Sequence, residues 1–501
     1  MNTFNQRVRR PMPRLRLGGA LHERMAAPDR SSPHALSLRI DPAIAALTAI
    51  AFAAAFYRLG AKGLWVDEAF SANYARLDLS GLWHVVSGRD PNMGLYYVLL
   101  HFWVGIFGSS EPALRSLSAI VGALAIPFAV LLGTHLFGRP AGLVAGLLLA
   151  LNPFFVQYEQ IARSYALVVL LVLASCWAFV LALERPTRTR LLAWVLTSAL
   201  SVYAHYFAAL VLLAQLATLV AFAPRQTVRG RWLVPVAAVI ALCMPAAVFA
   251  SHEQGSGVEW IVTPSFADLL RVPSGITGGT GLAIVLSALA CFGFIHAMRT
   301  GQRWQAEFVG AWLFVPVALD FIESRVGNPL FVTHYLIVVL PALLLLAAAG
   351  VAALPRRIAA VGACCLLVAV GLVYARSWYD EPSLEGYRGA TAYVLGAAQR
   401  GDDIVYYPEL ALGGPSQGFA YYEFRSHTAG PRPIPLALTA ASSSARPRRF
   451  WLVIRNSDVP RQRRDTIEAG VAAHYVAVAR QTGFRNLTVI LYRRRSSPRA
   501  G

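Results

Sequence analysis

Long apolar segments dominate the chain and alternate with short basic loops. Nine segments have roughly the length of a membrane-spanning helix, at about 42–59, 114–137, 141–156, 165–183, 232–250, 276–298, 304–322, 331–354 and 358–376. About 20 apolar residues in a row are needed for a helix to cross a bilayer, which most of these segments approach or exceed. The pattern therefore predicts an α-helical polytopic membrane protein.

One further apolar run, 191–222, is too long for a single span and is bordered by Arg190 and Arg225. Basic loops mark the cytoplasmic side of a membrane protein. The run must therefore leave and return as two short helices, with a turn near 205–207. The same reasoning makes 95–107 an amphipathic helix that lies at the outer surface without spanning. The pattern predicts about 11 spans, with the N-terminus in the cytoplasm.

The two ends of the chain differ from the apolar middle. Residues 1–40 are rich in Arg, Pro and Ser and have no signal-peptide pattern, so we expect a disordered basic cytoplasmic arm. Three short strand-like runs follow residue 376, at 404–407, 450–454 and 487–492. We therefore expect a membrane domain at 41–376 and a small soluble extracytoplasmic α/β domain at 377–501.

Composition supports this architecture. The 501 residues are 56% hydrophobic and 14% charged, with a mean hydropathy of +0.51, which is too apolar for one soluble core. The net charge of +19 could indicate a nucleic-acid-binding protein, but the arginines lie in the arm, the loops and the tail, where they are typical of topology signals. The expected partner is the lipid bilayer, not nucleic acid. The five cysteines all fall in apolar segments, so no disulfide framework or zinc site is indicated.

Acidic residues gather where the chain leaves its first span. Asp67 and Glu68 follow that span directly, and Asp90 precedes the apolar stretch 95–107. A carboxylate this close to a bilayer is costly to leave unsolvated, so such a cluster indicates a functional site. The loop 60–113 that carries the three acids is therefore the expected catalytic loop.

The order of these features resembles the GT-C glycosyltransferases. The segments that carry the resemblance are Leu64–Ser71, Asp90–Tyr97, Gln157–Leu167 and Tyr203–Phe207. The closer similarity is to the integral-membrane mannosyltransferase-like group (glycosyltransferase family 39-like), which is related to protein O-mannosyltransferases and aminoarabinose transferases. An Arg-Tyr-Leu pattern of that group appears here as His334-Tyr335-Leu336. The resemblance implies a GT-C fold.

The resemblance also implies an activity: transfer of a sugar, mannose or another hexose or pentose, from a polyprenyl-phosphate donor to an acceptor hydroxyl outside the membrane. By position, Asp67 matches the family's catalytic acid, although an acid there could also cap a helix. Asp90 is the expected second acid, because the turn at Pro91 and Asn92 could aim it inward. Glu68 is expected to contact the acceptor or a metal ion, or to form a structural hydrogen bond.

The donor phosphate needs a cationic or hydrogen-bonding pocket. Arg163 lies on the same predicted face as Asp67, and its guanidinium presents a fork that matches phosphate oxygens. It could instead lie at the membrane interface or pair with Glu159. Four further residues could hydrogen-bond the donor or be structural: His205, Tyr206, His334 and Tyr335. A divalent cation between the acids is possible, but no cofactor is expected to be obligatory.

These expectations describe an inverting, multi-pass glycosyltransferase of a bacterial cytoplasmic (inner) membrane. A transporter or flippase for lipid-linked sugars is one alternative, and it would show internal repeats or mid-membrane charges. The sequence has no convincing repeat, and its charges gather outside the spans. A non-catalytic scaffold for lipid-linked sugars is another alternative. The acceptor could be a protein, a lipid or a polysaccharide.

Overall fold

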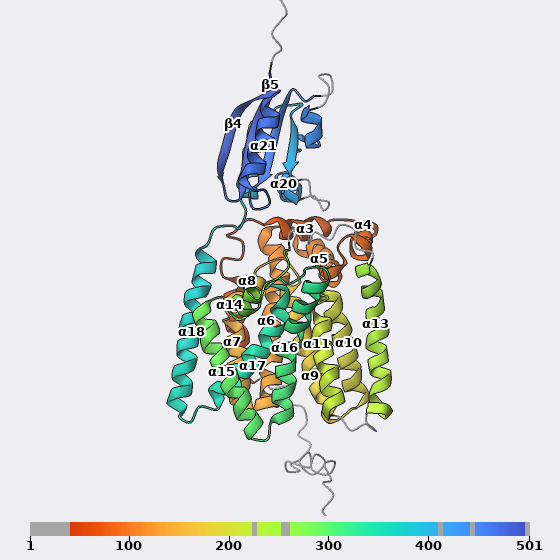
Figure 1. Ribbon diagram of the computed structural model, residues 1–501, viewed down its shortest axis with the longest axis vertical. Helices are drawn as coiled ribbons and strands as arrows, with labels where there is room; N and C mark the ends of the chain where they lie inside the picture. The colour runs from red at the N-terminus through yellow and green to blue at the C-terminus, as the bar shows by residue number, and fades with distance from the viewer. Residues whose placement is uncertain (1–40, 223–227, 252–260, 409–413, 441–445, 496–501) are drawn as a thin grey trace, which may run out of the picture. The chain divides into compact units, whose positions relative to one another are not determined.

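The computed structural model describes residues 41–222, 228–251, 261–408, 414–440 and 446–495. The basic arm predicted at 1–40 lies outside the described residues. The rest forms a bundle of apolar helices followed by a small five-stranded sheet with its own helices (Figure 1). The predicted fold class, a helical polytopic membrane protein with a C-terminal α/β part, is confirmed.

The helices of the bundle fall into two groups along the chain. Up to residue 159 they are α2 (Pro42–Phe56), α3 (Val66–Tyr74), α4 (Leu79–His84), the π-helix η1 (Val85–Arg89), the 3-10 helix η2 (Pro91–Met93), α5 (Gly94–Phe107), α6 (Glu111–Phe137), α7 (Arg139–Ala150) and α8 (Pro153–Glu159). After it they are α9 (Tyr165–Glu184), α10 (Arg188–Ala204), α11 (Ala208–Phe222), the π-helix η3 (Val228–Trp232), α13 (Leu233–Ser251), α14 (Phe266–Thr277), α15 (Thr280–Arg299), α16 (Arg303–Val326), the 3-10 helix η4 (Tyr335–Val339), α17 (Leu340–Ala352) and α18 (Arg357–Asp380).

Seven of the described helices are long and apolar enough to cross a membrane. They are α6, α9, α13 together with the end of η3, α15, α16, η4 continued by α17, and α18. The helices α2 and α11 are also apolar but shorter, and α10 has 17 residues. The predicted number of about 11 spans therefore stays a prediction.

The span predicted at 141–156 is broken in the structure. It consists of α7 and α8, which are bent by 59° at the break between them. Asn152 accepts a hydrogen bond from the Phe155 backbone N–H at 2.9 Å, and Pro153, at the first position of α8, has no N–H to continue the preceding helix. These two residues start a new helix in a new direction, which apolar content alone does not reveal.

Two other predictions, both about where helices begin and end, are confirmed. The run 191–222 divides into α10 and α11, and the break falls at His205, Tyr206 and Phe207. The stretch predicted as a separate helix at 95–107 is α5, in which Phe102, Ile106 and other apolar side chains are exposed. Figure 1 shows α3, α4 and α5 at the same end of the helices.

The helix α17 forms the centre of the bundle, and nearly all of its residues are buried. It packs against α7, α15 and α16 (Figure 1). At its crossing with α15, a Cβ placed on Gly350 would lie 2.1 Å from the Leu289 carbonyl oxygen, and one on Gly293 would lie 2.2 Å from that of Leu346. Small residues let the two backbones touch, which is the usual way membrane helices associate.

The C-terminal sheet has the strand order β2-β1-β3-β5-β4. Its elements are α19 (Tyr387–Ala397), β1 (Asp403–Tyr407), α20 (Gly414–Ser426), β2 (Arg432–Pro433), the 3-10 helix η5 (Leu436–Ala440), β3 (Arg449–Arg455), α21 (Arg461–Ala472), β4 (Tyr475–Phe484) and β5 (Leu487–Arg494). β1 pairs in parallel with β2 and β3, whereas β5 pairs antiparallel with β3 and β4. The three predicted strands are β1, β3 and β5, and β2 and β4 were not predicted.

Both faces of this sheet are covered. Along β3, Phe450, Leu452 and Ile454 join one apolar cluster, while Trp451 and Val453 join the other, because successive strand residues point to opposite faces. Helices α19 and α20 cover the Trp451 face, and α21 and η5 contact the opposite side. Both faces of the sheet are therefore covered. The loops and the outer surfaces of α19 and α20 remain for contacts with other parts of the chain, such as that of α20 with α3.

Candidate active site

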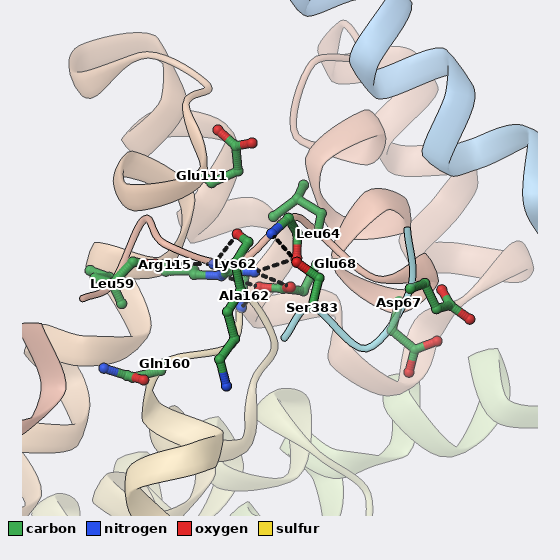
Figure 2. A network of polar contacts seen from close by, with 12 residues as sticks. Leu59, Lys62, Leu64, Asp67, Glu68, Glu111, Arg115, Gln160, Ala162 and Ser383 are labelled. Atoms are coloured by element: carbon green, nitrogen blue, oxygen red, sulfur yellow. Dashed lines mark hydrogen bonds and ion pairs between the residues drawn. The ribbon is translucent and has the colours of Figure 1, made fainter. Parts of the chain in front are cut away.

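The first acidic pair lies in the first turn of α3. Val66, Ala69 and Ala72 are buried, so the helix packs through a face of small and apolar residues. Asp67 and Glu68 are consecutive, and consecutive residues on a helix point about 100° apart. Figure 2 shows the consequence: Glu68 points into a network around Arg115, whereas Asp67 is set apart from it.

Glu68 forms a buried ion pair with Arg115 of α6. The Arg115 Nε donates to Glu68 Oε1 at 2.7 Å, and Nη2 donates to Oε2 at 2.6 Å. The Ala162 backbone N–H also donates to Oε1 at 3.0 Å. The side chains of Glu68 and Arg115 are 1% and 5% exposed. Both carboxylate oxygens are thus occupied, and of the alternatives expected for Glu68 the structure favours the structural one.

The remaining Arg115 donors fix the chain that leads into α3. Arg115 Nη1 donates to the carbonyl oxygens of Leu59 and Lys62 at 3.0 and 2.9 Å, and Nη2 donates to that of Gly63 at 3.2 Å (Figure 2). A guanidinium with all five donors in a rigid fork can hold several acceptors at once. The pair therefore fastens the loop before Asp67 to the top of α6.

Asp67 has different surroundings. Its carboxylate forms no side-chain hydrogen bond or ion pair within the part of the chain that the structure describes, and it is only partly buried. It nevertheless lies within electrostatic range of Arg163, Tyr158 and Tyr165. An accessible carboxylate near a guanidinium is suited to accept a proton from a bound molecule.

Asp90 and Arg163 are joined through a tyrosine. The Tyr97 hydroxyl donates to Asp90 Oδ2 at 2.6 Å, and Arg163 Nη1 donates to the same hydroxyl oxygen at 2.9 Å. Asp90 follows the π-helix η1, and its N–H donates to the Val85 carbonyl at 2.9 Å. Single π turns are frequent at functional sites, since they re-aim the residues beside them. Here the π turn directs Asp90 toward α5.

Burial raises the pKa of Asp90, although the Arg163 guanidinium and the Tyr97 hydroxyl act in the opposite direction. Asp67 adds to the rise, because two like charges close together disfavour ionisation of both. The second expected acid therefore holds its proton more firmly than an exposed aspartate does. The structure brings Asp67, Asp90 and Arg163 into one cluster, as the sequence predicted.

Arg163 lies in the bend between α8 and α9. Its backbone carbonyl accepts from the Ser118 hydroxyl at 3.1 Å, which attaches the bend to α6. Its Nε is buried and has no partner among the described residues. Glu159, which the sequence offered as a possible ion-pair partner, also lacks a partner there. The guanidinium thus retains an unused donor beside the two aspartates.

An aromatic cluster lies next to the acids. The His334 ring is 5.4 Å from Tyr165 and 5.9 Å from Tyr158 between centroids, and it stacks on the latter. His205 lies 6.0 Å from Tyr165 and 5.2 Å from Tyr335. Five polar rings from three segments that are distant in the sequence therefore pack together.

The two histidines of this cluster are neutral. Burial, with the nearby positive charge of Arg163, lowers the pKa of both His205 and His334 to about 3. Neutral imidazoles can donate or accept a hydrogen bond but add no positive charge. Arg163 is therefore the source of positive charge between these rings and the aspartates.

Tyr206 takes part through its backbone. Its N–H donates to the Asn92 Oδ1 at 3.0 Å, which ties the α10–α11 turn to the residues just after Asp90. The Phe207 N–H donates to His205 Nδ1 at 3.3 Å. These contacts fix the turn, and they place the His205 ring toward Tyr335.

Several buried polar atoms around Arg163 lack a protein partner. Among the described residues, they include Arg163 Nε, His205 Nε2, Tyr165 OH and Tyr74 OH. Buried polar groups are almost always hydrogen-bonded, so a group of orphans at one place indicates a site for a polar ligand. The donor-rich composition of the group suits an anion.

The arrangement offers few ligands for a metal ion. Within the described ranges, no three His, Cys, Asp or Glu side chains lie together in a way that could hold one. Glu68 is already engaged on both oxygens, which leaves Asp67 and Asp90 as the carboxylates of the cluster. Hard divalent cations take six or more oxygen ligands, so two carboxylates would need water or substrate to complete the shell.

Five residues of the site were not assigned a role from the sequence. Tyr97 and Asn92 stand in the segment that carried the resemblance, but their partners lie 66 and 114 residues away. Arg115 had a readable signal, because a charged residue within an apolar span is usually functional or paired. Tyr158 and Tyr165 lie in the segment Gln157–Leu167, in which the sequence assigned a role in the site only to Arg163.

Comparisons with known proteins bear on the fold and on part of the sequence. A family model described as dolichyl-phosphate-mannose-protein mannosyltransferase matches residues 91–249, less than half of the chain. The matched range includes Arg163, His205 and Tyr206. A search of curated protein sequences finds no match.

Solved structures share the fold at low identity. ArnT from Cupriavidus metallidurans, bound to undecaprenyl phosphate, has 13% identity and a TM-score of 0.61, with 89% of this chain and 97% of that chain covered. The archaeal oligosaccharyltransferase AglB from Archaeoglobus fulgidus, in complex with an inhibitory peptide and a dolichol-phosphate, has 12% identity and a TM-score of 0.51, with 83% and 69% covered. The chain has the GT-C fold, so the resemblance inferred from the sequence is confirmed.

Proposed function

We propose that this protein is an inverting membrane glycosyltransferase that uses a polyprenyl-phosphate sugar as donor and an extracytoplasmic hydroxyl as acceptor. The observation that carries the proposal is the juxtaposition of an open carboxylate, Asp67, with a buried guanidinium, Arg163, that has an unused donor. A base and an anion-binding group side by side are the two chemical parts that sugar transfer from a lipid phosphate requires.

In the proposed reaction, Asp67 takes the proton of the acceptor hydroxyl while the acceptor oxygen attacks the anomeric carbon of the sugar. The bond between that carbon and the phosphate oxygen breaks, and the polyprenyl phosphate leaves with the electron pair. The new carbon–oxygen bond forms on the face opposite to the leaving phosphate, so the configuration inverts. Arg163 stabilises the charge that develops on the phosphate.

The other residues orient these two groups. Asp90 acts as the second acid and holds Tyr97, which in turn accepts from Arg163. His205, His334 and Tyr335 supply neutral hydrogen-bonding groups near the phosphate, and Tyr206 holds the turn that carries His205. Holding donor and acceptor in line lowers the barrier by several kcal/mol through orientation alone.

The identity of the donor rests on two supports. ArnT of Cupriavidus metallidurans binds undecaprenyl phosphate and AglB of Archaeoglobus fulgidus binds a dolichol-phosphate, and both share the fold. The matched family model concerns a dolichyl-phosphate-mannose donor. We therefore propose that the donor is mannose or another hexose or pentose linked to a polyprenyl phosphate. The proposed acceptor is a protein, a lipid or a polysaccharide.

We further propose a bacterial inner-membrane location, with the N-terminus in the cytoplasm and with α3, the acids and the C-terminal domain outside. The membrane domain would comprise 41–376 and the soluble domain 377–501. The basic loops support this orientation, because arginines concentrate on the cytoplasmic side of short loops.

We propose no obligatory metal ion, because among the described residues the cluster offers only the carboxylates of Asp67 and Asp90, of which Asp90 already accepts from Tyr97, and its positive charge comes from Arg163. A chelator should leave the transfer rate unchanged, and a divalent cation added back should not raise it by more than a small factor. A rate that is abolished by the chelator and restored by Mg²⁺ or Mn²⁺ would contradict this assignment.

Transfer of radiolabel from a panel of polyprenyl-phosphate sugars into membrane acceptors tests the function. Wild-type protein and Asp67→Asn are compared at matched amounts of folded protein. Incorporation by the wild type alone supports a transferase that uses Asp67. Absence of incorporation across the whole panel would instead favour a transporter or a scaffold for lipid-linked sugars.

A further inference from the structure

The helix that carries Asp67 does not cap its own N-terminus. Trp65 stands at the N-cap position of α3 and makes no side-chain cap hydrogen bond. The first N–H groups of a helix have no partner within the helix, so they need acceptors from elsewhere. Ser, Thr, Asp or Asn usually supplies one from the N-cap position itself.

The C-terminal domain supplies the missing cap. Glu385, which precedes α19, accepts a hydrogen bond from the Val66 backbone N–H at 2.8 Å, across a sequence separation of 319 residues. Glu385 is 3% exposed. A negative charge at a helix N-terminus is favourable, and more so when it is shielded from water. Val66 is the residue immediately before Asp67.

Glu385 is itself held from two sides within the C-terminal domain. Arg455, at the end of β3, donates to Glu385 Oε1, and Asn486 Nδ2 donates to the same oxygen at 3.2 Å. Arg455 also bonds Asp458 Oδ2 at 2.7 Å. The carboxylate that caps α3 is therefore positioned by the sheet and has little freedom of its own.

Other side chains of the C-terminal domain hold the same segment. Ser383 Oγ accepts from the Gly63 N–H at 2.6 Å (Figure 2), and the Tyr422 hydroxyl accepts from the Leu64 N–H at 2.8 Å. At the other end of α3, Asn73 Nδ2 donates to the carbonyl and the side-chain oxygens of Gln417 at 3.0 and 2.8 Å. Arg115 bonds the carbonyl groups of this loop, whereas the C-terminal domain bonds its N–H groups. The loop is therefore held by both the membrane helices and the C-terminal domain.

We infer that Glu385 is a positioning residue for the reaction: by capping α3 from the C-terminal domain, it fixes the direction in which Asp67 faces Arg163. This inference rests on the proposed function, in which Asp67 is the base. The C-terminal domain is then part of the catalytic machinery's support and not only a site for the acceptor. A misplacement of about 1 Å at a reacting group can lower a rate about 100-fold.

The test uses full-length protein in lipid nanodiscs and three variants. Glu385→Leu removes the acceptor for the Val66 N–H, Glu385→Gln keeps an oxygen that can accept it, and Glu381→Gln is the matched control. Glu381 lies in the same connecting segment and pairs with Arg485, but that pair is about 41% exposed and does not touch α3. Hydrogen exchange is measured on the peptide that covers 64–74, together with kcat and KM for the donor.

Glu385→Leu should raise the exchange rate of the first α3 amides at least about 10-fold and lower kcat at least about 10-fold, with the donor KM unchanged. Glu385→Gln should recover most of both, and Glu381→Gln should match the wild type. Wild-type exchange and kcat in Glu385→Leu would overturn the inference. An equal loss of kcat in Glu385→Leu and Glu385→Gln that disappears when kcat is calculated per folded molecule would also overturn it. Such a loss would come only from a smaller amount of folded protein.

Two provisions keep the result decisive. If Glu385→Leu does not fold, Ser383→Ala removes only the acceptor of the Gly63 N–H and should still raise exchange at the start of α3 several-fold; wild-type exchange there overturns the inference. If the wild type transfers no sugar from any donor, the proposed function fails. The exchange measurement then decides separately whether the C-terminal domain orders α3, and unchanged exchange in Glu385→Gln and Glu385→Leu rejects that coupling as well.

Discussion

Asp67 and Glu68 are neighbours in one helical turn, but their carboxylates have opposite surroundings. Every oxygen of Glu68 is bonded, to Arg115 and to the Ala162 N–H, and the pair is almost completely buried. The Asp67 carboxylate has no such partner in the described part of the chain, and the nearby Arg163 retains an unused Nε donor. The two acids look equivalent in the sequence and are not equivalent in space.

The different surroundings of Glu68 and Asp67 suit different roles, one structural and one chemical. A buried charge whose partners are all in the protein stabilises one geometry and has nothing left to offer a ligand. A charged group that lies beside donors without a partner can still bind a ligand together with them. The Glu68–Arg115 pair therefore holds the loop, and the Asp67–Arg163 cluster is the place where we propose that the substrate reacts.

The largest expected effect comes from Asp67→Asn. We expect it to lower kcat by about 10²–10⁴-fold, the usual contribution of a general base. Donor KM and the melting temperature should change little, because the carboxylate has no hydrogen-bond or ion-pair partner among the described residues. Initial rates with a productive donor and a thermal melt of the same sample measure both. Wild-type activity in this variant would transfer the role of base to Asp90.

Glu68→Gln should act on stability instead of on chemistry. Removing one member of a buried ion pair leaves the Arg115 charge uncompensated, which is expected to lower the free energy of unfolding by about 3–5 kcal/mol. The matched control is Glu307→Gln, because Arg303 and Glu307 form a pair one helical turn apart in which the side chains are 72% and 29% exposed, and such pairs contribute about 1 kcal/mol or less. Thermal melts in detergent compare the two. Equal melting temperatures would contradict the structural role of Glu68.

The contrast between the two acids was only half visible in the sequence. Their position after the first span marked a functional site, but the partner of Glu68 lies 47 residues away on another helix. Local patterns report burial and turns, and they contain no information on which distant side chain meets which. The choice between the two expected roles of Glu68 therefore needed the structure.

The same limit applies to the fold. Apolar length and arginine positions located most of the long helices and the break at 205–207, since those follow from the local sequence. The strand β4 was missed because most of its residues are exposed and it lacks an apolar run. The contact of Glu385 with Val66 joins residues 319 positions apart, and neither has a local signal for it.

Arg163→Met tests whether the cluster binds a phosphate. The neutral His205 and His334 cannot replace the lost charge, so kcat/KM should fall by about 10²–10³-fold, with part of the loss in donor KM. Arg163→Lys should recover part of it, since it keeps the charge but not the fork. Arg89→Met, an exposed arginine next to Asp90, is the control and should stay near wild type. A loss of equal size in both variants would mean that overall charge, and not this site, is responsible.

The smallest effect is expected from Tyr97→Phe, and it is a shift in pH dependence. The Tyr97 hydroxyl donates to Asp90 Oδ2 at 2.6 Å, and such a bond stabilises the charged form of the carboxyl group and lowers its pKa. Its removal therefore raises the pKa of Asp90 further above the ordinary value. Asp90 then becomes protonated at a higher pH.

If the reaction needs Asp90 ionised, the acid limb of the rate profile in Tyr97→Phe should move to higher pH, while the rate well above that limb changes only a few-fold. Tyr96→Phe is the matched control, because the Tyr96 hydroxyl bonds Ser118 at 2.8 Å and does not contact Asp90. Its acid limb should coincide with that of the wild type. A limb that stays in place in Tyr97→Phe would show that Asp90 is not the group that titrates.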